Sequence, residues 1–169
     1  MIHSLQTLLL MIFPVLVIAG AVRDLTSYTI PNVISLGLVA AFPVAALALG
    51  LPPLSIAVAF GLGVAALVVG MGMFAAGWIG GGDAKLFAAA ALWVGLPGML
   101  SYLVFTCLAG GALAAGLVAL RLPVVRMVLP TGPAWFCRLA QPGENVPYGV
   151  AIAIGALAAY PVSSLVGRL

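Results

Sequence analysis

Long runs of apolar residues occupy most of the sequence, and short segments rich in proline, glycine or polar residues separate them. A helix that crosses a bilayer needs about 20 mainly apolar residues, close to the length of most of these runs. Continuous runs argue against a transmembrane β-barrel, whose strands alternate apolar and polar residues. The pattern therefore predicts an all-α, polytopic membrane protein that forms one membrane domain over residues 1–169. Its six transmembrane helices are expected at approximately 4–22, 32–49, 54–76, 84–96, 99–120 and 148–166.

The breaks between the runs predict where the helices begin and end. Residues 23–31 are expected to form a short polar turn, after which Pro31 is well placed to start the next helix. The fourth run is short, because its roughly 13 residues rise only about 20 Å against a hydrocarbon core of ~30 Å. Either this helix crosses a locally thin region of the bilayer, or the preceding Asp83 lies below the membrane surface.

Composition supports a membrane protein and excludes an ordinary soluble domain. The mean hydropathy is +1.34 and only 5% of residues are charged, whereas a soluble domain has about 25%. No basic patch interleaved with aromatic residues indicates nucleic-acid binding, and nothing indicates a cofactor. The two cysteines, Cys107 and Cys137, provide neither a disulfide framework nor a four-ligand zinc site, so we expect them to be small apolar side chains.

The few cations predict the orientation of the chain. With six crossings, the loops 23–31, 77–83 and 121–146 lie on one side of the membrane. That side carries five cations, which are Arg23, Lys85, Arg121, Arg126 and Arg138. The other side has Arg168 and His3, so the positive-inside rule predicts both termini outside and the polar loops in the cytoplasm. We therefore expect a multi-pass protein of the inner (cytoplasmic) membrane, with loop 121–146 partly on the membrane surface.

The first run is not expected to be a cleaved signal peptide, because no Lys or Arg precedes it. It is therefore counted as the first transmembrane helix.

Two aspartates stand at the ends of apolar runs, on the same predicted side of the membrane. Asp24 follows the first run, and Asp83 follows three glycines in the stretch 78–85, which reads Trp-Ile-Gly-Gly-Gly-Asp-Ala-Lys. A charged side chain at membrane depth costs roughly 2.5–3.5 kcal/mol on insertion scales, so its presence there indicates function. The glycines before Asp83 let the backbone approach a substrate closely, or adopt a positive φ, without a Cβ in the way.

The chemistry of two such carboxyls leaves several hypotheses open. Held close together, they share one proton, so that one acts as a base on water while the other donates a proton to a carbonyl oxygen. They would also suit an ion or proton pathway. Alternatively, Asp24 and Asp83 are helix N-caps or plain charges at the membrane interface.

Three stretches together resemble the prepilin peptidase family of intramembrane aspartyl proteases. The first is Asp24 followed by Ile30-Pro31-Asn32, and the second is Gly80-Gly81-Gly82-Asp83-Ala84-Lys85. The third is Pro147-Tyr148-Gly149 at the start of the last predicted helix. Their order and spacing, together with the six predicted helices, agree with that family along essentially the whole chain.

This resemblance implies a function and a set of site residues. It implies cleavage of the leader peptides of type IV prepilins or pilin-like proteins at the cytoplasmic membrane face, with Asp24 and Asp83 as the catalytic acids and no metal. Larger members also carry a cysteine-rich zinc element and methylate the new N-terminus. The first polar loop here lacks cysteine, so the chain is similar to the short, peptidase-only form of tight-adherence pilus systems. The residues expected to bind substrate or support the site are Gly80, Gly82, Lys85, Asn32, Pro147, Tyr148 and Gly149.

Alternatives remain for several of these residues and for the function. Asn32 would suit an N-cap, Tyr148 an interfacial aromatic and Lys85 a topology anchor, while Trp78 and Trp93 are expected in the interfacial aromatic belts. Glu144 is a further residue that would line the site. The rival functions are a small ion- or proton-coupled transporter and a non-catalytic assembly factor for a pilus or secretion system.

Overall fold

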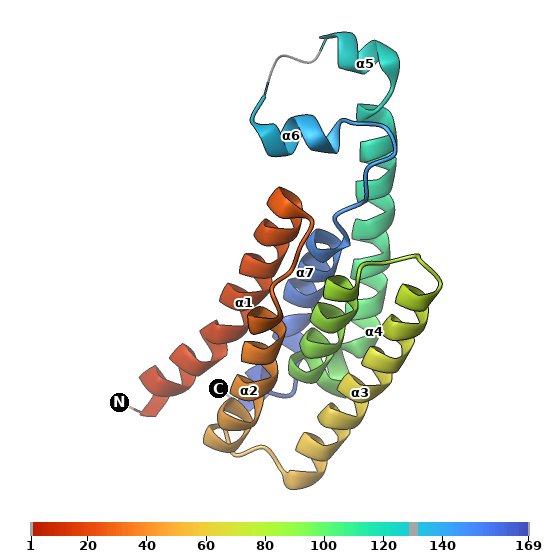
Figure 1. Ribbon diagram of the computed structural model, residues 1–169. Coiled ribbons are helices and arrows are strands. Elements are labelled where there is room, and N and C mark those ends of the chain that lie inside the picture. Colours follow the sequence, from red (N-terminus) through yellow and green to blue (C-terminus); the bar gives the residue numbers. More distant parts are fainter. Residues whose placement is uncertain (1, 129–131, 169) are drawn as a thin grey trace.

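The computed structural model describes residues 2–128 and 132–168, and this part of the chain is helical without strands. The helices form an elongated bundle, with two short helices beyond one of its ends (Figure 1). The elements are α1 (Ile2–Ser27), α2 (Asn32–Ala48), α3 (Pro53–Ala75), α4 (Gly81–Leu120), α5 (Pro123–Val128), α6 (Ala134–Leu139), α7 (Tyr148–Ala159) and the 3₁₀ turns η1 (Tyr160–Val162) and η2 (Val166–Arg168).

Helix α4 is a helical hairpin. Gly95 has φ 65° and ψ −176°, outside the helical region, and Pro97 follows it. The Tyr102 hydroxyl donates a hydrogen bond to the Phe87 carbonyl at 3.2 Å, although the two residues are 15 positions apart. A straight helix would separate them by about 22 Å, so the chain reverses at Gly95. Glycine suits this turn because residues with a side chain rarely adopt a positive φ.

The hairpin gives six apolar helical segments where six helices were predicted. Among the described residues, four stretches are long and apolar enough to cross a membrane, namely Leu5–Ser27, Pro53–Ala75, Gly81–Leu120 and Tyr148–Arg168, and α2 is a shorter apolar helix. The break predicted after the fourth run, 84–96, is present at Gly95. The last helix, predicted at 148–166, ends earlier than predicted. Regular α-helix stops at Ala159, and 3₁₀ turns continue the segment.

Two expectations about the first breaks were wrong. The polar turn expected at 23–31 is shorter, because residues 23–27 form the last turn of α1. Hydrogen bonds from the Thr26 and Ser27 hydroxyls to main-chain carbonyls of the preceding turn satisfy those polar side chains within the helix. Asn32 is not an N-cap either. Pro31 occupies that position, and α2 starts with Asn32.

Trp93 lies in the protein core and not in an interfacial belt, so that expectation was also wrong. Its side chain is 1% exposed. The indole N–H donates a hydrogen bond to the Leu38 carbonyl at 2.9 Å, and its ring packs against Phe13 and Phe42. A tryptophan is buried readily when its N–H finds a partner. Trp78, in contrast, is 70% exposed.

Small residues allow α7 to lie directly against the second half of α4. A Cβ at Gly155 would sit 2.7 Å from the Thr106 main-chain nitrogen and 2.9 Å from its Cα. Helices approach this closely where small residues face each other, which is the usual packing mode within membranes. Tyr148 at the start of α7 and Gly80 directly before α4 line one cavity, where the candidate site lies.

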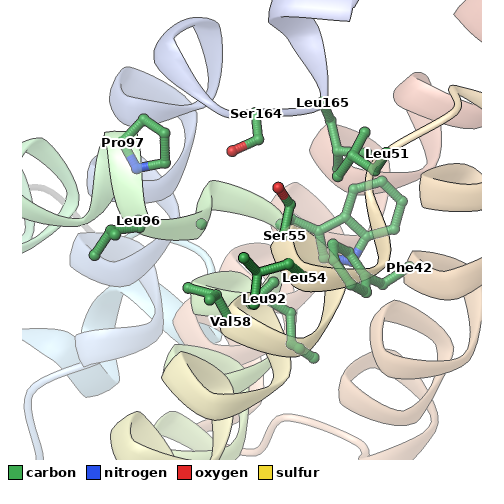
Figure 2. A pocket seen from close by; sticks show the side chains of 13 residues that line it. Phe42, Leu51, Leu54, Ser55, Val58, Leu92, Leu96, Pro97, Ser164 and Leu165 are labelled. Atoms are coloured by element: carbon green, nitrogen blue, oxygen red, sulfur yellow. The ribbon is translucent and has the colours of Figure 1, made fainter.

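The two ends of the bundle differ in their chemistry. The α4 turn lies at one end, beside a cavity of about 250 Å³. Figure 2 shows that apolar side chains line it, with Ser55 and Ser164 as its hydroxyl groups. None of the described residues that line this cavity is charged. Helices α5 and α6 lie beyond the opposite end, α6 close to the end of α1 and α5 close to the end of α4 (Figure 1).

Residues 129–131, which fall inside the predicted loop 121–146, lie outside the described residues. On either side of them the loop forms the short helices α5 and α6.

Candidate active site

Both aspartates line one polar cavity of about 400 Å³ at the end of the bundle near α6. Asp24 comes from the last turn of α1, and Asp83 from the first turn of α4. Both side chains are buried, at 4% and 6% exposure. Together with them, the lining consists of Tyr28, Gly77, Trp78, Ile79, Gly80, Glu144, Asn145, Val146 and Tyr148.

Asp24 is held against the start of α7. Its Oδ2 accepts a hydrogen bond from the main-chain N–H of Gly149 at 2.7 Å, although the two residues lie 125 positions apart. The first N–H groups of a helix have no partner within it, and the helix dipole favours a negative charge there. The hypothesis that Asp24 is the N-cap of a helix that starts at it was therefore wrong. Asp24 lies near the end of α1, and its side chain caps the start of a different helix, α7.

Asp83 is anchored by the glycines before it. Its Oδ2 accepts a hydrogen bond from the Gly80 N–H at 3.1 Å. Gly80 is the N-cap of α4, so the hypothesis that Asp83 itself is the N-cap was wrong. The second oxygen, Oδ1, is buried and has no hydrogen-bond partner among the described residues. One carboxylate oxygen is thus held by the main chain, and the other makes no hydrogen bond to a described residue.

Ile30 brings the three motifs together. A Cβ on Gly82 would lie 3.1 Å from the Ile30 Cβ, and a Cβ on Gly149 would lie 2.9 Å from its Cδ1. The same Cβ on Gly149 would lie 2.8 Å from Oδ2 of Asp24. Ile30 therefore packs against glycines of the other two motifs. A residue with a Cβ at position 82 or 149 would be too close to the Ile30 side chain. Its close packing explains why both glycines stand where they do.

Two of the expected site residues lie elsewhere. The Lys85 ammonium donates a hydrogen bond to Oδ1 of Asn32 at 3.0 Å. Both residues line a separate groove between α2, α3 and α4, not the aspartate cavity. Lys85 and Asp83 are two positions apart, and such residues do not share a helix face.

Pro147 is the N-cap of α7 and is fully buried, so it sets the start of the helix that carries Gly149.

Arg121 positions the loop that closes the cavity. Its Nε donates a hydrogen bond to the Leu139 carbonyl at 3.0 Å, and its Nη2 donates one to the Asn145 carbonyl at 3.1 Å. These bonds tie the end of α4 to the end of α6 and to the segment before α7. Glu144 reaches the cavity from that segment, as expected from the sequence. Arg121 itself was treated only as a topology determinant, because nothing in the sequence pairs it with distant carbonyls.

Tyr28 is a cavity residue that the sequence analysis missed. Its backbone has φ 51°, a left-handed conformation that is uncommon for a non-glycine residue and that recurs at functional sites. Its hydroxyl is buried and has no hydrogen-bond partner among the described residues. Burial raises the pKa of this phenol, and the nearby Glu144 carboxylate adds to the shift. The group is therefore a neutral O–H donor at ordinary pH. The only feature of the sequence that could have pointed to Tyr28 is its position shortly after the first apolar run, four residues beyond Asp24.

No group of three or more His, Cys, Asp and Glu side chains that could hold a metal ion occurs in the part of the chain that the structure describes. The expectation of a metal-free site stays a prediction.

A protein-family model described as the type IV leader peptidase family matches residues 11–115. The chain belongs to that family. The matched region contains both aspartates and Tyr28, whereas Tyr148 and Gly149 lie beyond it. Membership supports a protease of the leader-peptidase kind embedded in a membrane, as the resemblance had implied. Comparisons with curated proteins and with solved structures gave no match.

In a leader peptidase of this geometry, Tyr28→Phe is expected to lower kcat about tenfold with little change in KM. The change removes only the buried hydroxyl that faces the aspartate cavity. The measurement is steady-state cleavage of a leader-containing substrate in detergent or vesicles. Tyr160→Phe is the control, because that phenol donates a hydrogen bond to the Leu10 carbonyl away from the cavity. An unchanged kcat in Tyr28→Phe would show that the hydroxyl takes no part.

Proposed function

We propose that the protein is an intramembrane aspartyl endopeptidase that removes the leader peptide from type IV prepilins or pilin-like proteins at the cytoplasmic face of the inner membrane. It does so without methyltransferase activity. The observation that carries the proposal is the burial of Asp24 and Asp83, from distant parts of the chain, in one polar cavity. Family membership supports the peptidase activity, and the pair of carboxyls supports the aspartic mechanism.

The proposed reaction needs no group beyond the two carboxyls and water. The ionised aspartate takes a proton from a water molecule, whose oxygen attacks the carbonyl carbon of the scissile amide. The protonated aspartate gives its proton to the carbonyl oxygen, which yields a tetrahedral diol. The C–N bond then breaks. The amine leaves with the proton taken from water, a hydroxyl proton returns to the second aspartate, and both carboxyls regain their starting states.

The two carboxyls have different partners, which suits a division of roles. The Gly149 N–H binds one oxygen of Asp24, and the helix dipole of α7 acts on the same oxygen. Asp83 keeps one buried oxygen without a partner. We assign contact with the water or the substrate carbonyl to this oxygen. We also assign to the Tyr28 hydroxyl, which belongs to a residue lining the same cavity, a hydrogen bond to the reacting groups.

The activity is tested by co-expressing the protein with a candidate prepilin and following the leader's removal by gel shift and mass spectrometry. The expected product has lost its leader and carries a free, unmethylated N-terminus, which its mass identifies. A product heavier by one methyl group would contradict the absence of methyltransferase activity. No cleavage of several pilin types would favour the transporter or the assembly factor.

The six-crossing arrangement and its orientation are part of the proposal. The helical hairpin of α4 supports six crossings, and both described chain ends lie at the end of the bundle away from α5 and α6 (Figure 1). Even numbers of crossings return the chain to the side on which it started. The positive-inside rule then places α6 and the aspartate cavity on the cytoplasmic side.

Cys137 gives a direct test of this orientation. It lies exposed on α6, so a membrane-impermeant maleimide is expected to label it in inside-out vesicles but not in intact cells. A Cys137→Ser variant that also carries Leu54→Cys serves as the control. Leu54 is 75% exposed near the opposite end of the bundle, and its label should enter from outside. Labelling of Cys137 in intact cells would reverse the proposed orientation.

A further inference from the structure

An apolar groove opens beside the aspartate cavity, between α3, the second half of α4, and α7. Its volume is about 490 Å³. Trp78, Ile79 and Tyr148 line both the groove and the cavity, so the two adjoin at these side chains. A molecule lying in the groove would therefore reach the carboxyls without leaving the protein surface.

The walls of this groove suit an apolar helix. None of the described residues that line it is charged. Along α4 it extends from Leu103 to Ala114, about 17 Å of helix axis. Gly110 and Gly111 form part of the wall, and small residues let another helix approach closely within a membrane.

A second groove on the bundle lacks the connection to the cavity. The groove that contains Lys85 and Asn32, between α2, α3 and α4, has a volume of about 410 Å³. It shares no lining residue with the aspartate cavity. A helix bound there would hold its backbone away from the carboxyls. Adjacency to the cavity therefore selects the groove beside α7.

We propose that the groove between α3, α4 and α7 binds the apolar helix of the peptidase's own membrane-anchored substrate, and that the substrate backbone leaves this helix at Tyr148 to enter the aspartate cavity. This inference rests on the proposed function. An amide inside a helix is already hydrogen-bonded and enclosed, so the scissile bond must lie in extended chain at the helix end. Trp78 and Tyr148 stand at that transition.

Gly111 offers a steric test of the groove. A Cβ there would meet nothing within 4 Å in the protein itself, so Gly111→Leu starts its side chain in open space on the groove wall. Gly116 on the same helix is equally open but does not line the groove. Both changes replace glycine with a better helix former. Gly111→Leu is expected to raise KM for the prepilin about tenfold or more with kcat little changed, and Gly116→Leu to leave both at wild-type values.

Cys107 provides a second readout that does not depend on turnover. It is exposed and lines the groove. In a Cys137→Ser background, short thiol-to-thiol crosslinkers are applied to co-expressed prepilins that carry single cysteines along the apolar segment. The expected adducts recur every three to four positions, because one face of the substrate helix meets α4. Gly111→Leu should abolish them.

The outcomes separate this inference from the proposed function. Cleavage by wild type without prepilin adducts at Cys107, or with KM unchanged in Gly111→Leu, overturns the groove and leaves the peptidase. Adducts only between two Cys107 residues would assign the groove to a second copy of the chain, and adducts at every position would show unspecific contact. Both outcomes overturn the proposal. A protein that neither cleaves nor crosslinks overturns both.

Discussion

Asp24→Asn and Asp83→Asn are each expected to lower leader cleavage by about 10³-fold or more while the protein remains folded in the membrane. Asparagine has nearly the shape of aspartate and keeps a carbonyl oxygen. That oxygen can still accept the hydrogen bond from the Gly149 N–H or the Gly80 N–H. An amide neither takes nor gives a proton at ordinary pH, so the change removes the acid–base function and preserves the contact.

The assay compares both variants with wild type at equal membrane abundance, and the leader's removal is quantified by mass spectrometry. Glu144→Gln provides a matched acid-to-amide change in the same cavity. It is expected to keep cleavage within a few-fold of wild type, because the proposed reaction uses two carboxyls only. Cleavage at the wild-type rate by either asparagine variant would refute the two-aspartate mechanism. Tolerance of Asp→Glu at both positions, together with gradient-dependent activity, would favour a transporter.

Gly149→Ala is expected to lower cleavage by about 100-fold. The added methyl group would lie 2.8 Å from Oδ2 of Asp24 and 2.9 Å from Cδ1 of Ile30. Real carbon atoms do not approach neighbours this closely, so the start of α7, the Asp24 side chain or the turn at Ile30 must shift. A displacement of about 1 Å at reacting groups costs on the order of 10²-fold in rate.

Gly116→Ala is the control, because a Cβ there meets nothing within 4 Å. We expect wild-type cleavage from it. Ile30→Val removes the Cδ1 atom that would meet the new methyl group, so the double variant Gly149→Ala with Ile30→Val should recover part of the lost rate. Coupling between neighbouring residues of this kind appears as non-additivity. If Gly149→Ala cleaves like wild type, the close approach of α7 to Asp24 has no catalytic role.

The sequence determined the features that follow from local chemistry. Apolar runs of membrane-spanning length fix the helical class, since a backbone in lipid must satisfy its own hydrogen bonds. The break at Gly95 and the start of α7 after Pro147 were also predictable, because glycine and proline act on the backbone where they stand. The choice of Asp24 and Asp83 as candidate site residues followed from the cost of placing a carboxyl at membrane depth.

The sequence misled where a hydrogen bond, within a helix or to a distant carbonyl, satisfies a polar side chain. Residues 23–27 look like a loop because they are polar, yet their hydroxyls bond to carbonyls of α1 and continue the helix. Trp93 looks like an interfacial residue, yet the Leu38 carbonyl accepts its N–H and allows its burial. In both cases a hydrogen bond satisfies a polar group that the sequence alone leaves unpaired.

The site itself depended on the tertiary structure. The sequence pointed to Asp24, Asp83 and Gly149 but could not place both aspartates in one cavity or Gly149 against Asp24. Ile30 packing against two glycines, and the Gly149 N–H bonding to Asp24, join segments that are far apart along the chain. The separation of Lys85 and Asn32 from the cavity, and the presence of Tyr28 in it, also arise from helix packing. Which side chains meet depends on how closely helices approach, and close approach depends on residue size at both surfaces at once.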